Sequence, residues 1–158
     1  MSIETRAEMF RRELRKLYHA ELEILDLHRE LAAAAASEEV VALFADHRAD
    51  TTDQITRIEG MFETIGAEPD PRASPIMEGL IAEKDEFVAE VEGDDLRDSD
   101  AIALGTINER IEITLLDRLI ILATHLDYPD RLVAALETNR AEAESALAEM
   151  RAVAERRA

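Results

Sequence analysis

The 158-residue sequence contains no cysteine and no tryptophan, and only 4% of its residues are aromatic. Without cysteine, neither a disulfide framework nor a thiolate metal site can form. Glycine and proline are also scarce, at five and four residues. No long segment alternates apolar and polar residues as a strand does. Because 47% of the residues are nevertheless hydrophobic, the chain can build a core. These features predict an all-α protein with a single domain spanning residues 1–158.

Basic side chains are also few, since 18 Lys and Arg residues face 36 Asp and Glu residues and the net charge is −18. This charge repels phosphate backbones and anionic lipids, so we expect neither a nucleic-acid partner nor a membrane partner. Lys16 and Lys84 are the only lysines. An acidic surface with arginine in place of lysine is typical of a salt-loaded cytoplasm, where ions screen self-repulsion. We interpret the protein as halophilic, and an acidic protein from a GC-rich organism is the alternative.

Long uncharged apolar runs are missing too. The N-terminal segment is charged, and the most apolar window still contains Glu109, Glu112 and Asp117. This pattern indicates neither a signal peptide nor a membrane-spanning helix, so we expect a cytoplasmic protein.

Apolar residues recur at helical spacing in four long segments and one shorter one. Ser37 is a predicted N-cap, and Pro75 and Pro129 are predicted first helical residues. The predicted pattern is a four-helix bundle with an additional short helix between the second and third long helices. We interpret GDDLRDSD at residues 93–100 as a connector, capped at its end by Ser99 or Asp100. The predicted helices cover residues 2 or 5 to 35, 38 to 65, 75 to 92, 102 to 126 and 129 to 153.

The segment at residues 102–126 carries two acidic residues on an apolar stripe. Taking every third or fourth residue gives Ile102, Gly105, Glu109, Glu112 and then further apolar residues. Two carboxylates one turn apart repel each other and lose hydration when buried. A proton, an arginine or a metal ion must therefore compensate them, and the stripe itself leaves all three options open.

Each of the other long helices also places polar residues inward, near its middle. The pattern identifies Glu21 with His28, then His47 with Asp50, and finally a group in the last helix. A ring of carboxylates and imidazoles inside a bundle is how carboxylate-bridged di-iron and di-manganese centres are built. His28 lies two turns from Glu21, which is too far for the same ion. The group in the last helix consists of Asn139, Arg140 and Glu142.

Several segments resemble the YciE/YciF-type ferritin-like stress proteins. They are LYHAE at 17–21, HRADTTDQITRIEGMFETIG at 47–66, MEGLIAE at 77–83 and ERIEI at 109–113. The resemblance implies a ferritin-like four-helix bundle, a di-metal centre with two iron or manganese ions per chain, a homodimer and a cytoplasmic, stress-related role. The metal ligands that it implies are Glu21, His47, Asp50, Glu109, Glu112 and Glu142.

The sequence also departs from this family. Arg110 stands where the family commonly has histidine, and Asn139, Arg140 and Ala141 replace most of an acidic run before Glu142. The Glu-x-x-His pairs that ferritin-like proteins use on two helices are absent. Two functions therefore stay open. The protein is a ferroxidase or peroxide-scavenging oxidoreductase that acts on iron, dioxygen or peroxide, or it is a metal-free, dimeric structural or interaction protein whose decayed site is neutralised by Arg140.

Overall fold

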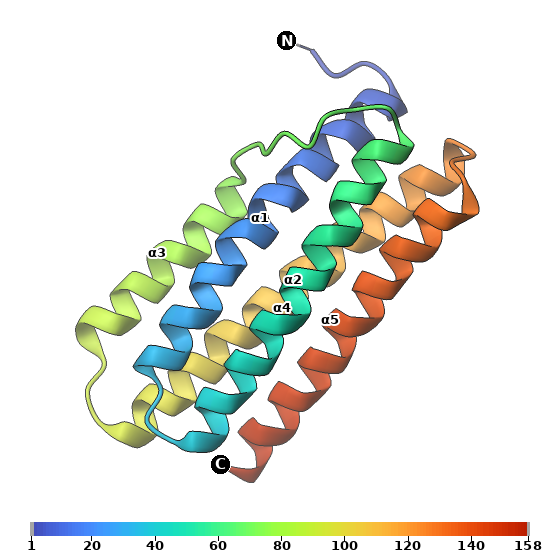
Figure 1. Cartoon of the computed structure of the whole chain (residues 1–158). Helices are drawn as coiled ribbons and strands as arrows, with labels where there is room; N and C mark the ends of the chain where they lie inside the picture. Colours follow the sequence, from blue (N-terminus) through green and yellow to red (C-terminus); the bar gives the residue numbers. More distant parts are fainter. Residues whose placement is uncertain (1, 158) are drawn as a thin grey trace.

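The computed structural model describes residues 2–157, which fold into five helices without a strand (Figure 1). Four long helices form a bundle, and the shorter α3 packs against α1 and α4 on its outside. The predicted all-α bundle with an additional helix between the second and third long helices is therefore confirmed. The helices are α1 (Arg6–Ala34), α2 (Glu38–Thr64), α3 (Pro75–Glu90), α4 (Asp94–His125) and α5 (Asp130–Arg156).

Around the bundle, α1 packs against α2 and α4, while α5 packs against α4 and α2. The contacts between antiparallel neighbours set their register. Near one end of the bundle, Tyr18 of α1 donates a hydrogen bond to Glu59 of α2 (3.1 Å). Further along the same pair, His28 faces His47, with ring centroids 6.1 Å apart. This register decides which polar side chains share a level of the bundle.

The helices begin largely where the sequence predicts. Thr5 and Glu8 form a capping box at the start of α1, and the Ser37 hydroxyl accepts a hydrogen bond from the backbone N–H of Val40. Pro75 opens α3 as predicted. Among residues 2–157, no helix has both the length and the apolar character that a membrane crossing requires.

The predicted connector at residues 93–100 is wrong, because α4 already begins at Asp94. Gly93 makes the turn with a φ of 96°, where other residues are strained. Asp94 and Asp95 then lie in the first turn, where acidic side chains stabilise a helix. Asp98 is buried and accepts hydrogen bonds from backbone N–H groups of the α1–α2 connection. The acidic segment is therefore the first turns of α4 and carries a tertiary contact.

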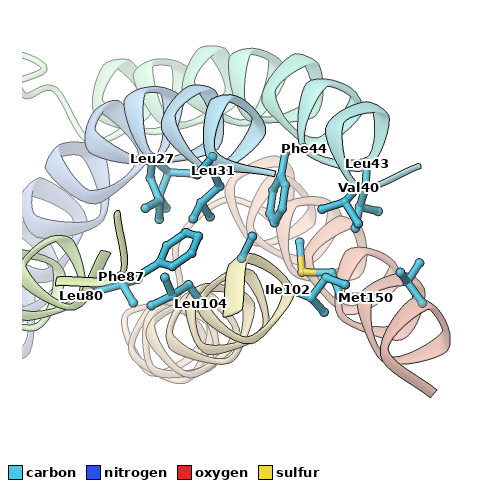
Figure 2. Close-up of a cluster of buried hydrophobic side chains, with 14 of the residues drawn as sticks. Leu27, Leu31, Val40, Leu43, Phe44, Leu80, Phe87, Ile102, Leu104 and Met150 are labelled. Carbon is cyan, nitrogen blue, oxygen red and sulfur yellow. The ribbon is translucent and has the colours of Figure 1, made fainter. Parts of the chain in front are cut away.

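Two hydrophobic clusters fill the bundle, one toward each end. The first gathers Leu31, Phe44 and Met150, among others, and α3 adds Phe87 to it (Figure 2). The second is built around Phe10 and other side chains of all four long helices. Between the two clusters, each long helix contributes polar side chains, and we call this band the polar layer. Its buried members are Glu21, His28, His47, Thr51, Gln54, Asn108, Glu109, Glu112 and Asn139.

Gly105 lets α4 come close to its neighbours in the first cluster. A Cβ atom at this position would lie 2.8 Å from Cε1 of Phe44 and 2.9 Å from Sδ of Met150. Because real Cβ contacts are longer than this, the ring of Phe44 and the end of the Met150 side chain would have to shift to accept a Cβ atom. Glycine therefore fits the close packing at this point.

Candidate metal centre in the polar layer

Glu21, Glu109 and Glu112 lie together in the polar layer, and we call these three residues the carboxyl cluster. They are only 2%, 3% and 2% exposed. Glu112 is hydrogen-bonded to both Glu21 and Glu109, and Nδ2 of Asn108 also donates to it (3.4 Å). Oε2 of Glu21 is buried without a hydrogen-bond partner. The adjacent helices α1 and α4 thus concentrate three acidic groups in one dry volume.

Burial favours the protonated forms of the acids in this cluster. Burial raises the pKa of Glu21 and of Glu109 well above the ordinary value, and the charge of Glu112 raises both further. Burial also raises the pKa of Glu112 to about 7, although hydrogen bonds from Glu109, Asn108 and Glu21 oppose this shift. Burial therefore favours the protonated forms of Glu21 and Glu109, which are able to donate hydrogen bonds to Glu112.

The predicted neutralisation by Arg140 is wrong. Arg140 pairs with Asp117 of α4 and with Glu144 one turn further along α5 (2.9 Å to Glu144). Its side chain is 31% exposed, at the outer edge of the α4–α5 contact. Within residues 2–157, no Lys or Arg forms an ion pair with a carboxyl group of the cluster. Of the three options for compensating these buried acids, a proton and a metal ion remain.

Glu142 borders the cluster, and its charge is taken up by another residue. It lies near enough to help raise the pKa of Glu21. Arg57 of α2 pairs with Glu142 and donates a second hydrogen bond to Oδ1 of Asn139 (3.0 Å). Sequence reasoning missed Arg57. Arg57 follows Gln54 by one helical turn and lies on the same side of α2, and this spacing could have indicated that Arg57 borders the polar layer.

His47 is buried but lies at a different level from the cluster. Its Nε2 is 3.1 Å from Oε2 of Glu149, and its ring faces His28. Glu21 precedes His28 by seven residues, which corresponds to about 10 Å along α1. Because α1 and α2 run antiparallel, the α2 residue near the level of Glu21 is Gln54, which is buried. The predicted grouping of His47 with the carboxylates is therefore not found.

Asp50 is exposed on α2, although its charge helps to raise the pKa of Glu109. The structure thus brings together three of the six predicted ligands. Glu142 borders them, while His47 and Asp50 stand apart. The role of all six as metal ligands stays a prediction.

The carboxylate oxygens of the cluster are suitable ligands for a hard cation. Their present arrangement, however, is not that of a metal site. Among residues 2–157, no group of three or more His, Asp or Glu side chains is already arranged to hold a metal ion. In the cluster, hydrogen bonds turn the carboxyl groups toward one another. Once deprotonated, however, carboxylates are ligands that iron and manganese accept. Because Oε2 of Glu21 has no partner, a cation can satisfy it without breaking an existing bond. Binding requires the loss of protons and rotation of the carboxylates.

The comparisons with known proteins support the resemblance to YciF-type proteins. The family model described as "Domain of unknown function (DUF892)" matches residues 5–158. The structure of the E. coli stress protein YciF is 26% identical, covers 98% of both chains and has a TM-score of 0.93. YcfI from Rhodopseudomonas palustris, for which a structural role has been suggested, is 27% identical, covers 95% of both chains and has a TM-score of 0.92. No curated protein matches the sequence.

Proposed function

Because the chain belongs to the DUF892 family and is similar to the stress protein YciF over nearly its whole length, we propose that it is a stress-associated, ferritin-like protein that binds iron or manganese. The observation that carries this proposal is the carboxyl cluster. Its three acidic side chains are buried together, and no Lys or Arg among residues 2–157 pairs with them. A bound cation would neutralise the three carboxylates in place of their protons.

The energetic cost of the metal-free cluster supports this proposal. A rise in the pKa of Glu112 from 4.5 to about 7 corresponds to about 3 kcal/mol of lost stability once the group ionises. The shifts of Glu21 and Glu109 go in the same direction. Apolar side chains at these positions would carry no such cost. Metal binding removes it, because the charge of the ion stabilises the deprotonated ligands.

Within this proposal, Glu21, Glu109 and Glu112 are the primary ligands. Glu142 becomes a further ligand if Arg57 releases it, while His47 and Asp50 require larger rearrangements. Nδ2 of Asn108 orients the Glu112 carboxylate, and the two hydrophobic clusters keep bulk water from the polar layer. Bound iron or manganese would supply reactivity toward dioxygen or peroxide, which is ferroxidase or peroxide-scavenging chemistry.

A structural or interaction protein without metal is the second candidate. It is favoured by the hydrogen bonds that already satisfy most of the cluster and by the ion pair that occupies Glu142. The suggested structural role of the similar protein YcfI points the same way. In this alternative, shared protons neutralise the cluster permanently.

Three further proposals extend the first. We propose a homodimer, which is supported by Ile107 and Ile121 on one face of α4, because these side chains are 46% and 59% exposed. A cytoplasmic location and a halophilic origin are supported by the acidic composition and the shortage of lysine. None of the three depends on the carboxyl cluster.

Elemental mass spectrometry of tag-free protein, before and after anaerobic loading with ferrous iron at pH 8, tests the metal proposal. We expect uptake of about two ions per chain, as in di-iron bundles, and loss of this uptake in Glu109→Gln/Glu112→Gln. The matched control is Glu83→Gln/Glu86→Gln, which changes two exposed acids at the same spacing on α3. Loaded wild type without metal contradicts the proposal and favours the structural protein.

A further inference from the structure

Two buried imidazoles lie one level away from the carboxyl cluster, and most of their nitrogens have no partner. His28 of α1 is 1% exposed and His47 of α2 is 4% exposed. Both ring nitrogens of His28 and Nδ1 of His47 lack a hydrogen bond. Buried polar atoms are rarely left unsatisfied, because each one costs free energy. A bound ion that accepts imidazole nitrogens as ligands would satisfy these atoms.

The surroundings of His28 leave its ring nitrogens without a strong partner. The ring of Phe44 lies with its centroid 6.0 Å away, and it offers no acceptor for a strong hydrogen bond. The guanidinium of Arg48 donates from Nε to the carbonyl oxygen of Leu25. Within residues 2–157, neither ring nitrogen of His28 is therefore engaged by a neighbour.

We propose that His28, His47 and Glu149 form a second metal site for a zinc- or copper-type ion, separate from the carboxyl cluster. The three side chains come from α1, α2 and α5, and they offer two imidazole nitrogens and one carboxylate. The centroids of the two rings are 6.1 Å apart, with an angle of 56° between their planes. Two nitrogens and one oxygen leave a fourth position for water in the tetrahedral geometry that zinc prefers.

Glu149 places this site at the surface of the bundle. Its side chain is 56% exposed, whereas that of His47 is 5% exposed, so the carboxylate forms the solvent side of the site. Oε2 of Glu149 now lies 3.1 Å from Nε2 of His47, where one proton joins the two atoms. Among residues 2–157 no three such side chains are already arranged around one point, so an ion that replaces this proton requires rotation of Glu149 and of the imidazole rings.

The two sites differ in the metals that they select. Imidazole nitrogens suit zinc, copper and nickel, whereas carboxylates suit manganese and other hard cations. The levels of His28 and Glu21 are about 10 Å apart along α1, so one ion cannot bridge them. The second site uses none of the three residues of the carboxyl cluster, and it assigns His47 to an ion other than the one that the cluster would hold.

Titration with Co²⁺ and Zn²⁺ tests the site in the Glu109→Gln/Glu112→Gln background, where the carboxyl cluster is disabled. We expect one Co²⁺ per chain, with the visible absorption of a four-coordinate ion, and displacement of Co²⁺ by Zn²⁺. Adding His28→Leu should weaken binding at least tenfold. His19→Leu is the matched control, because His19 is on the same helix but lies at the surface, 22% exposed.

Circular dichroism establishes that each variant is folded, and Glu149→Gln provides a second test that leaves the core unchanged. It should also weaken Co²⁺ binding. If folded His28→Leu binds Co²⁺ as tightly as its parent, or if the parent with the disabled cluster binds none, the site is refuted. Iron uptake by His28→Leu in the otherwise wild-type chain reports on the carboxyl cluster alone, so failure of either proposal is recognised separately.

Discussion

Replacing Glu112 by glutamine should stabilise the metal-free protein above pH 7, although it alters a buried, hydrogen-bonded side chain. Burial raises the pKa of Glu112 from 4.5 to about 7. For an acid whose pKa is raised by folding, the folded state holds the proton more tightly than the unfolded state. Its stabilising contribution is therefore complete below about pH 4.5, is lost as the pH rises to about 7, and does not change further above that. The total loss is about 3 kcal/mol.

Glutamine has nearly the same shape and never ionises, so it avoids this loss. The free energies of unfolding of the variant and the wild type should agree within about 1 kcal/mol at pH 5, where Glu112 is protonated. At pH 8 the variant should be more stable by up to about 3 kcal/mol. Urea unfolding followed by circular dichroism, with a chelator present, measures both values.

The control for this comparison is Glu86→Gln, which removes an exposed negative charge from α3. It accounts for the general self-repulsion of an acidic chain, which also grows with pH. If Glu112→Gln and Glu86→Gln show parallel stability profiles from pH 5 to pH 8, the buried acid is not the cause and the reasoning fails.

Iron or manganese should reverse the order of stability at pH 8. A ligand that binds only the folded state at 1,000 times its dissociation constant adds about 4.1 kcal/mol, which exceeds the difference of about 3 kcal/mol between the two proteins. The wild type should gain this stability, and Glu112→Gln should not, because it lacks a primary ligand. An equal gain in both proteins would place the metal outside the carboxyl cluster.

Gly105→Ala should destabilise the protein by about 1 to 3 kcal/mol, because its Cβ would lie 2.8 Å from Phe44; an unchanged melting temperature would contradict this packing. Asp98→Asn should cost about 1 to 3 kcal/mol in urea unfolding at pH 7. Burial acts to raise the pKa of Asp98, but hydrogen bonds and a nearby arginine lower it, so its contribution to stability is present above the unfolded pKa and should fade as the pH falls through the lower folded pKa. Arg57→Gln should free Glu142 and tighten Mn²⁺ binding severalfold in calorimetry, whereas weaker binding would show that Glu142 is not a ligand. Raising KCl from about 0.1 to 3 M should increase the melting temperature if the acidic surface is adapted to salt, and a constant melting temperature would contradict that proposal.

The helical period was sufficient to predict the helical bundle and the burial of the three residues of the carboxyl cluster. It places Glu109 and Glu112 on the apolar stripe of one helix and Glu21 on that of another, and all three are buried in the structure. Ser37 and Pro75 mark helix starts through local chemistry, which a sequence displays directly. These predictions succeed because they depend on which side of a helix a residue faces.

The period does not predict the height at which two helices meet. This height depends on the lengths of the connections and on the packing of the clusters at each end. In the structure, Gln54 of α2 lies near the level of Glu21, whereas His47 lies near the level of His28. The head groups of arginines are equally hard to place, because the side chain extends several ångströms from its own helix. Arg140 consequently pairs at the edge of α4, and Arg57 occupies Glu142.

The two polar sites also differ in how they exist without a metal. The carboxyl groups satisfy one another by sharing protons, so the stability of the cluster depends on pH between about 4.5 and 7. The two imidazoles make no hydrogen bond to each other, and burial lowers the pKa of His28 from 6.5 to about 3, so its burial costs more stability as the pH falls below about 6.5. The difference between the stability profiles of the wild type and Glu112→Gln therefore reports on the cluster, because His28 is common to both proteins, whereas added Zn²⁺ at constant pH reports on the imidazoles. Measured together, these two responses separate the proposed sites.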